Sequence, residues 1–303
     1  MASKIPVGRT IARSYGFAFG NLVNNLGAIW IPVAILYALT YFFQKQYMAA
    51  LLNVGTRDPG SIAAAMPFLL CATVVFVLLF VPQVAALAKE ALGLRKGNAF
   101  LQFPFGADAW RLIGAYLLFY VVLIVIYILL IVASLVLGIV AGSVGDHVPT
   151  AAAGLIGIAI ALFVVGAILY ITVRMSFLLP PVVVAEQRVS LIRGWELTKG
   201  NFWRIFLIVV VLILPFAIAE GIYVHYVYGD AFLPPLHATP EQLDAFMRHQ
   251  QEINRAVMAR TQQYWFLYYP VALLVSLVML GLFSGAAAFS YRVLSGTENG
   301  EAG

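Results

Sequence analysis

The sequence predicts an all-α integral membrane protein, a helical bundle of six transmembrane helices with interfacial amphipathic elbow helices. Hydrophobic residues make up 63% of the chain and charged residues only 10%, whereas charged residues are about a quarter of soluble domains. A helix needs roughly 20 apolar residues to cross a hydrocarbon core about 30 Å thick. The stretches that meet this need lie near 26–43, 62–88, 112–141, 151–173, 205–224 and 265–290. We therefore expect one transmembrane domain over residues 1–294 and a flexible polar tail over 295–303.

The segment before the first span is expected to form an amphipathic helix. It has no compact apolar core followed by a small-residue cleavage site, so the first span should stay as an anchor. Apolar residues recur at helical spacing, and basic and amide residues lie off that stripe. The stripe consists of Ile11, Tyr15, Ala18, Phe19 and Leu22. Such a helix suits the membrane interface, and the alternative is a cytoplasmic helix packed on other loops.

The orientation follows from the lysines and arginines between the spans. The N-terminal side of the membrane receives 13 of the 18 basic residues, and the other side receives five together with seven acidic residues. Because basic loops stay inside, both termini are predicted to be cytoplasmic. The net charge of +5 is then a topology signal, and no soluble basic face is present for nucleic acid.

The segment RGWELTKGNFWRIF, residues 193–206, introduces the fifth span. Gly200 can take the left-handed turn that ends a short elbow helix, and Asn201 tolerates the same geometry. Trp195 can dip into the acyl boundary, while Trp203 and Arg204 suit headgroup depth. We expect the segment to turn the chain into the membrane. An anionic headgroup held by Arg193, Lys199 and Arg204 is compatible with the same geometry, which makes acidic phospholipid the expected partner.

Residues 13–22 share the pattern of residues 193–202 at a constant offset of 180, and a third Gly-Asn pair lies at Gly97-Asn98. Three hairpins, each introduced by an elbow helix, would explain these matches. The alternative is chance similarity among Gly-rich membrane segments.

Residues 179–214 resemble the membrane domain attached to some bacterial glycerophosphodiester phosphodiesterases, which also occurs in related uncharacterised multi-span inner-membrane proteins. The matching positions are Pro180 or Pro181, Val182 to Val184, Glu186, Trp195, Leu197, Lys199, Gly200, Asn201, Trp203 and Arg204. Gly194 stands where that family usually has Ser. The resemblance implies a helical domain of the bacterial inner membrane without a settled activity. No soluble segment approaches the roughly 250 residues of the phosphodiesterase barrel.

The largest segment outside the membrane is expected at about 225–263. Thr239, Pro240 and Gln242 have the pattern of a helix start with a capping box, and the helix should pack across the outer face. The candidates for a site on this face are Glu220, His225, His249 and Glu252. His249 and Glu252 could form a metal site with His225, His237 or His147, although solvated surface residues are the alternative. We expect no metal and no cofactor.

The spans themselves carry few reactive groups. No charged residue lies between Arg111 and Asp146 or between Arg204 and Glu220, which argues against a proton relay. Cys71 is the only cysteine, and no catalytic triad or phosphate loop occurs, so no catalytic residue is predicted. Gly281 and Gly285 form a GxxxG motif, which favours close packing within the bundle or, alternatively, an oligomer.

We therefore expect a non-enzymatic inner-membrane protein that handles or organises lipid or another amphipathic molecule, or that acts as a membrane partner. The alternatives are a secondary transporter or channel and a membrane-embedded enzyme with an outer-face site.

Overall fold

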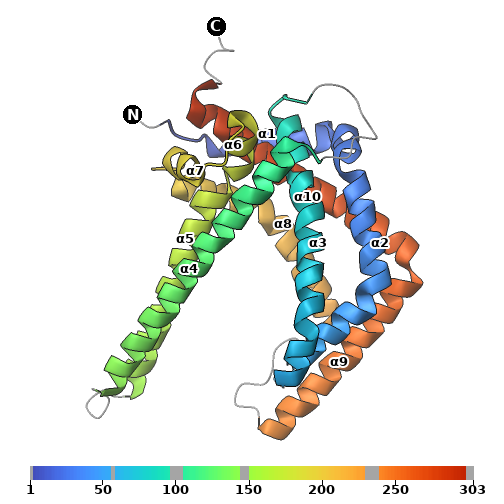
Figure 1. The fold of residues 1–303 in the computed structure, drawn as a ribbon, viewed down its shortest axis with the longest axis vertical. Coiled ribbons are helices and arrows are strands. Elements are labelled where there is room, and N and C mark those ends of the chain that lie inside the picture. Colours follow the sequence, from blue (N-terminus) through green and yellow to red (C-terminus); the bar gives the residue numbers. More distant parts are fainter. Residues whose placement is uncertain (1–2, 56–58, 96–104, 144–149, 229–238, 298–303) are drawn as a thin grey trace.

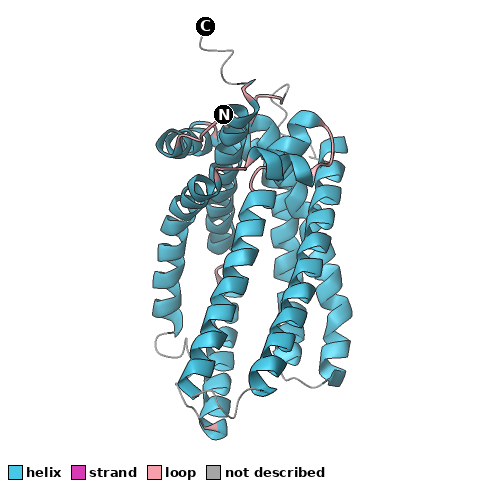
Figure 2. Cartoon of the chain, turned by 90° about the vertical axis from the view of Figure 1, so that its left-hand side faces the viewer, coloured by secondary structure: helices cyan, strands magenta, loops and turns pink. Residues whose placement is uncertain are grey.

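The computed structural model describes residues 3–55, 59–95, 105–143, 150–228 and 239–297, and its regular structure within these ranges is entirely helical (Figure 1, Figure 2). The helices are α1 (Val7–Gly20), α2 (Leu22–Gly55), α3 (Pro59–Ala91), α4 (Ala107–Ser143), α5 (Thr150–Ser176), α6 (Leu179–Glu186), α7 (Leu191–Leu197), α8 (Phe202–Tyr228), α9 (Pro240–Gln263) and α10 (Trp265–Ser295). The predicted all-α class is confirmed.

Six helical stretches of the described chain are long and apolar enough to cross a membrane, as predicted, so the chain is a multi-pass membrane protein. The fourth stretch continues past its predicted end at residue 173, through a turn, into α6 and reaches Glu186. Pro180 and Pro181 lie in the first turn of α6, where a missing backbone N–H costs no helical hydrogen bond. The turn therefore redirects the helix and does not end the apolar segment.

The first and last described residues lie at one end of the bundle, here called the terminal end, together with α1, α6 and α7 (Figure 1). Buried side chains gather there. Three helices start at the terminal end and run toward the opposite end (Figure 1). Among their described side chains, the last buried one is Val33 in α2, Phe119 in α4 and Leu212 in α8. In α3, Ala65 is a buried residue near the opposite end. The packed core thus fills mainly the terminal half of the bundle.

The α1 helix packs closely against α10 at the terminal end. A Cβ added at Gly281 would lie 3.2 Å from the Cβ of Ala18, and one added at Gly285 would lie 3.3 Å from the Cα of Ser14. The buried residues of α1 are Thr10, Ser14 and Ala18, whereas Phe19 of the predicted stripe is exposed. Small residues, and not the apolar stripe as a whole, form the contact face because glycines let two helices approach closely. Packing of the GxxxG motif within the bundle is confirmed.

The α4/α5 hairpin diverges from α2 and α3 toward the opposite end (Figure 1). Tyr127, Ile128 and Leu129 in α4 are 56%, 53% and 62% exposed. Successive side chains of an α-helix point about 100° apart, so three consecutive exposed residues leave little packed surface at this level. This part of the hairpin presents apolar side chains in most directions.

The helix predicted after Thr239 is present as α9, with its capping box. The backbone N–H of Gln242 donates to Thr239 Oγ1 at 3.3 Å, and the backbone N–H of Thr239 donates to Gln242 Oε1 at 2.9 Å. Its apolar residues Leu243 and Met247 are exposed, and α9 meets α10 at a bend near Tyr264 (Figure 1). The predicted third Gly-Asn copy and the tail after residue 297 lie outside the described residues.

Candidate functional site

The segment from α6 to the start of α8 forms the elbow predicted from the sequence. Ser190 caps α7, because its Oγ accepts the backbone N–H of Arg193 at 3.2 Å. Gly200 has a φ of +75°, as predicted for the turn that ends the elbow. Asn201 does not share this left-handed conformation: Gln187, between α6 and α7, is the non-glycine residue with positive φ among the described residues. The left-handed geometry that Asn201 could tolerate is therefore not used at this position.

Asn201 instead fastens the N-terminal segment to the elbow. Its Oδ1 accepts the backbone N–H of Ile5 at 3.1 Å, and its Nδ2 donates to the carbonyl of Ser3 at 3.0 Å. Arg204 Nη1 donates to the carbonyl of Ile5 at 2.7 Å. Asn201 and Ile5 are both buried. The Gly-Asn motif thus combines a left-handed turn at Gly200 with side-chain hydrogen bonds from Asn201 that hold the N-terminal segment.

Trp195 is held by a buried arginine on the preceding span. The guanidinium carbon of Arg174 lies 3.7 Å from the centre of the Trp195 ring, and Nη2 donates to the Trp195 carbonyl at 2.7 Å. Arg174 also donates to the Tyr170 hydroxyl at 2.8 Å and to Thr198 Oγ1 at 3.3 Å. A cation above an indole face is attracted by the ring quadrupole, more strongly when water is excluded. Trp195 is therefore part of the packing between α5 and α7.

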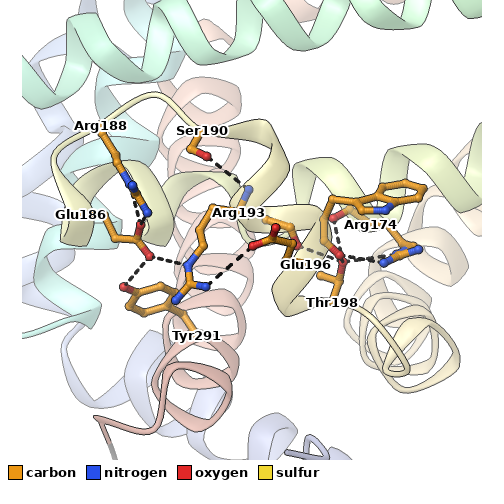
Figure 3. A network of polar contacts seen from close by, with 10 residues as sticks. Arg174, Glu186, Arg188, Ser190, Arg193, Glu196, Thr198 and Tyr291 are labelled. Carbon is orange, nitrogen blue, oxygen red and sulfur yellow. Dashed lines mark hydrogen bonds and ion pairs between the residues drawn. The ribbon is translucent and has the colours of Figure 1, made fainter. Parts of the chain in front are cut away.

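Glu186 is the centre of a second polar network, at the end of α6 (Figure 3). Its Oε2 accepts from Arg188 Nη2 at 2.6 Å, and its Oε1 accepts from Arg193 Nε at 3.1 Å. The Tyr291 hydroxyl of α10 donates to the same Oε1 at 3.4 Å. Arg193 also lies 3.9 Å from Glu196. This carboxylate links α6, α7 and α10 through charge-assisted hydrogen bonds.

The three basic residues proposed for headgroup contact therefore differ in their surroundings. Arg193 is paired with Glu186, and Arg204 donates to the carbonyl of Ile5. Lys199 and Trp203 are exposed, the latter at 75%. Two of the three charges have structural partners, which leaves Lys199 as the most accessible member. Their contact with lipid stays a prediction.

The outer-face candidates lie on α8 and α9. Glu220, His225, His249 and Glu252 are all exposed. His249 Nδ1 lies 3.9 Å from Glu252 Oε2, as their spacing on one helix predicts. Among the described residues, no three His, Cys, Asp or Glu side chains are grouped so as to hold a metal, and His147 and His237 lie outside them. The structure places these candidates on the surface.

Sequence reasoning missed both Arg174 and the role of Asn201. From the sequence, Arg174 was considered only as a basic residue at the end of a span. A charged group so close to an apolar segment nevertheless indicates that its side chain has a partner in the protein. Comparison with protein-family models, curated proteins and solved structures finds no match.

Proposed function

We propose that the chain is a non-enzymatic protein of the bacterial inner membrane that binds and organises phospholipid or a similar amphipathic molecule. Its termini lie in the cytoplasm in this proposal, which follows the bias of basic residues toward the terminal end. The likeness of residues 179–214 to the membrane domain of glycerophosphodiester phosphodiesterases is part of the same proposal.

The observation that carries the proposal is the uneven packing of the spans. Among the most apolar 18 residues of the third and of the fourth span, 11% are buried, whereas 44% are buried in the corresponding part of α10. Side chains such as Ile124, Ile128 and Val132 in α4 are apolar and more than half exposed. In a bilayer such surfaces must meet acyl chains or another apolar surface, because no water is available to them. Acyl chains can therefore lie against both the outer and the bundle-facing sides of the α4/α5 hairpin.

The charge pattern favours an amphipathic ligand over an ion. Ionisable groups in mid-membrane are costly and mark proton or ion pathways. In this sequence most of them stand toward the ends of the spans; Glu220 lies farther in, and Arg174 lies within the fourth apolar stretch, two residues before the end of α5. A polar headgroup at the membrane surface with acyl chains along the spans matches this distribution.

The test replaces Ile128 by a photoreactive phenylalanine analogue and illuminates native membranes. Ile208, which is fully buried in α8, is the matched control position. We expect a phospholipid adduct at 128 and none at 208. A protein-sized adduct at 128 would instead support a membrane partner.

A second measurement separates retained lipid from lipid that only surrounds the protein. After extensive detergent exchange, mass spectrometry should still find phospholipid bound to the purified chain. No retained phospholipid, together with a protonophore-sensitive solute flux in proteoliposomes, would overturn the proposal and favour a coupled transporter.

A further inference from the structure

A cavity of about 530 Å³ opens at the terminal end between α1, the end of α3 and α10. Arg9 and Arg13 of α1 and Arg292 of α10 line it. No acidic side chain is among the described residues that line it. Figure 1 shows α1 and α10 crossing in this region.

Arg13 and Arg292 are positioned by separate contacts. The Arg13 guanidinium carbon lies 4.5 Å from the centre of the Phe289 ring, and Arg292 Nη2 donates to the carbonyl of Ala91 at 3.0 Å. Arg9 is exposed and precedes Arg13 by one turn on the same helix face. Arg292 adds a third guanidinium group, so three donors of the same kind line one cavity.

Apart from Asn21, the rest of the lining is apolar or glycine and leaves room. Phe17 and Phe289 provide aromatic surface, and Gly16 leaves open space, since nothing lies within 4 Å of a Cβ added there. Guanidinium forks match the oxygens of a phosphate group in bidentate geometry, and a phosphate offers more oxygens than a carboxylate does to three guanidinium groups. The aromatic side chains suit the glycerol and upper acyl carbons of a lipid.

We propose that this cavity is a binding site for a phosphate group, held by Arg9, Arg13 and Arg292. The identification of its carrier as a phospholipid rests on the proposed function, whereas a soluble phosphate ester has the same headgroup chemistry. The site is distinct from the elbow residues Arg193, Lys199 and Arg204, which lie on α7, the turn after it and α8.

The test measures binding of two probes to lipid-depleted protein in a non-ionic detergent: a short-chain phosphatidic acid and inorganic phosphate. Arg9→Gln should weaken binding about fivefold, which corresponds to about 1 kcal/mol for one basic residue. Lys4→Gln is the matched control, because Lys4 is an exposed basic residue near α1 that does not line the cavity. It should change the affinity less than twofold.

A steric variant tests the cavity without altering its charge. Gly16→Leu should fill the space and weaken binding at least tenfold, whereas Gly8→Leu, on the same helix with equally open surroundings but outside the cavity, should not. A melting curve for each variant shows whether it is folded. If Gly16→Leu does not fold, the comparison of Arg9→Gln with Lys4→Gln decides.

The two probes separate the carriers. Phosphatidic acid that binds far more tightly than inorganic phosphate identifies a lipid, and comparable affinities identify a soluble phosphate ester; both support the site. Unchanged affinity for both probes in Arg9→Gln and Gly16→Leu would overturn it, even if the protein still retains lipid elsewhere. Loss of all lipid retention with intact phosphate binding would instead contradict the proposed function alone.

Discussion

Asn201→Ala should destabilise the protein by about 2–4 kcal/mol. The substitution removes the hydrogen bonds of 3.1 Å and 3.0 Å that hold Ile5 and Ser3. The Ile5 N–H is buried, and an unsatisfied buried donor costs about 1–3 kcal/mol. Ser3 is exposed, so water can replace its lost partner and the second bond should contribute only about 1 kcal/mol.

The assay is denaturant unfolding in detergent micelles, combined with hydrogen exchange of the N-terminal peptide. Lys199→Ala is the control, since Lys199 is exposed two positions away and should change stability by no more than about 0.5 kcal/mol. Arg204→Met should combine less than additively with Asn201→Ala, because both side chains hold Ile5. The reasoning is refuted if Asn201→Ala matches Lys199→Ala in stability and leaves exchange at Ile5 unchanged.

Gly281→Ala should cost about 1–3 kcal/mol by overpacking, because its Cβ would lie 3.2 Å from a side chain of α1, whereas Gly166→Ala has open space and should gain up to about 1 kcal/mol. Equal melting temperatures would show that α1 is not held against α10. Gly200→Val should cost more than Gly200→Asn, since at a φ of +75° most L-residues lose about 1–2 kcal/mol and Asn less; equal costs would contradict a turn role. Cysteines placed at Lys4 and Glu252, in a background without the native cysteine, test topology. An impermeant thiol reagent should label only the second in intact cells, and labelling of the first would reverse the predicted orientation.

Features that depend on the solvent or on neighbouring residues could be predicted from the sequence. The six spans follow from the thickness of the bilayer, whatever the helices contact. The capping box at Thr239 and the turn at Gly200 are set within a few residues. Such features do not need the rest of the fold.

Features that depend on distant partners could not be predicted in the same way. The side chain of Asn201 accepts a hydrogen bond from the backbone of Ile5, 196 positions earlier in the sequence, and no local sequence pattern predicts this bond. Apolar spacing predicted an amphipathic helix at α1 but not which face packs in the protein, because the glycines of α10 select the face with the smallest side chains. Close approach of two helix backbones adds dispersion contacts between the helices. Burying an apolar stripe adds little in a membrane, because lipid covers such a stripe equally well.

These long-range contacts make the two ends of the bundle physically different. At the terminal end, α1 is fixed by Gly281 and Gly285 of α10, and the segment before it is fixed by Asn201. Arg9 and Arg13 therefore stand on a helix whose position relative to Arg292 is held by packing, so these side chains would need little reorganisation to bind the proposed phosphate group. At the opposite end, the exposed apolar side chains of α4 have few protein neighbours, and their surroundings can adapt to acyl chains of different lengths. The proposed function assigns the headgroup to the packed terminal end and the acyl chains to the exposed apolar surfaces nearer the opposite end.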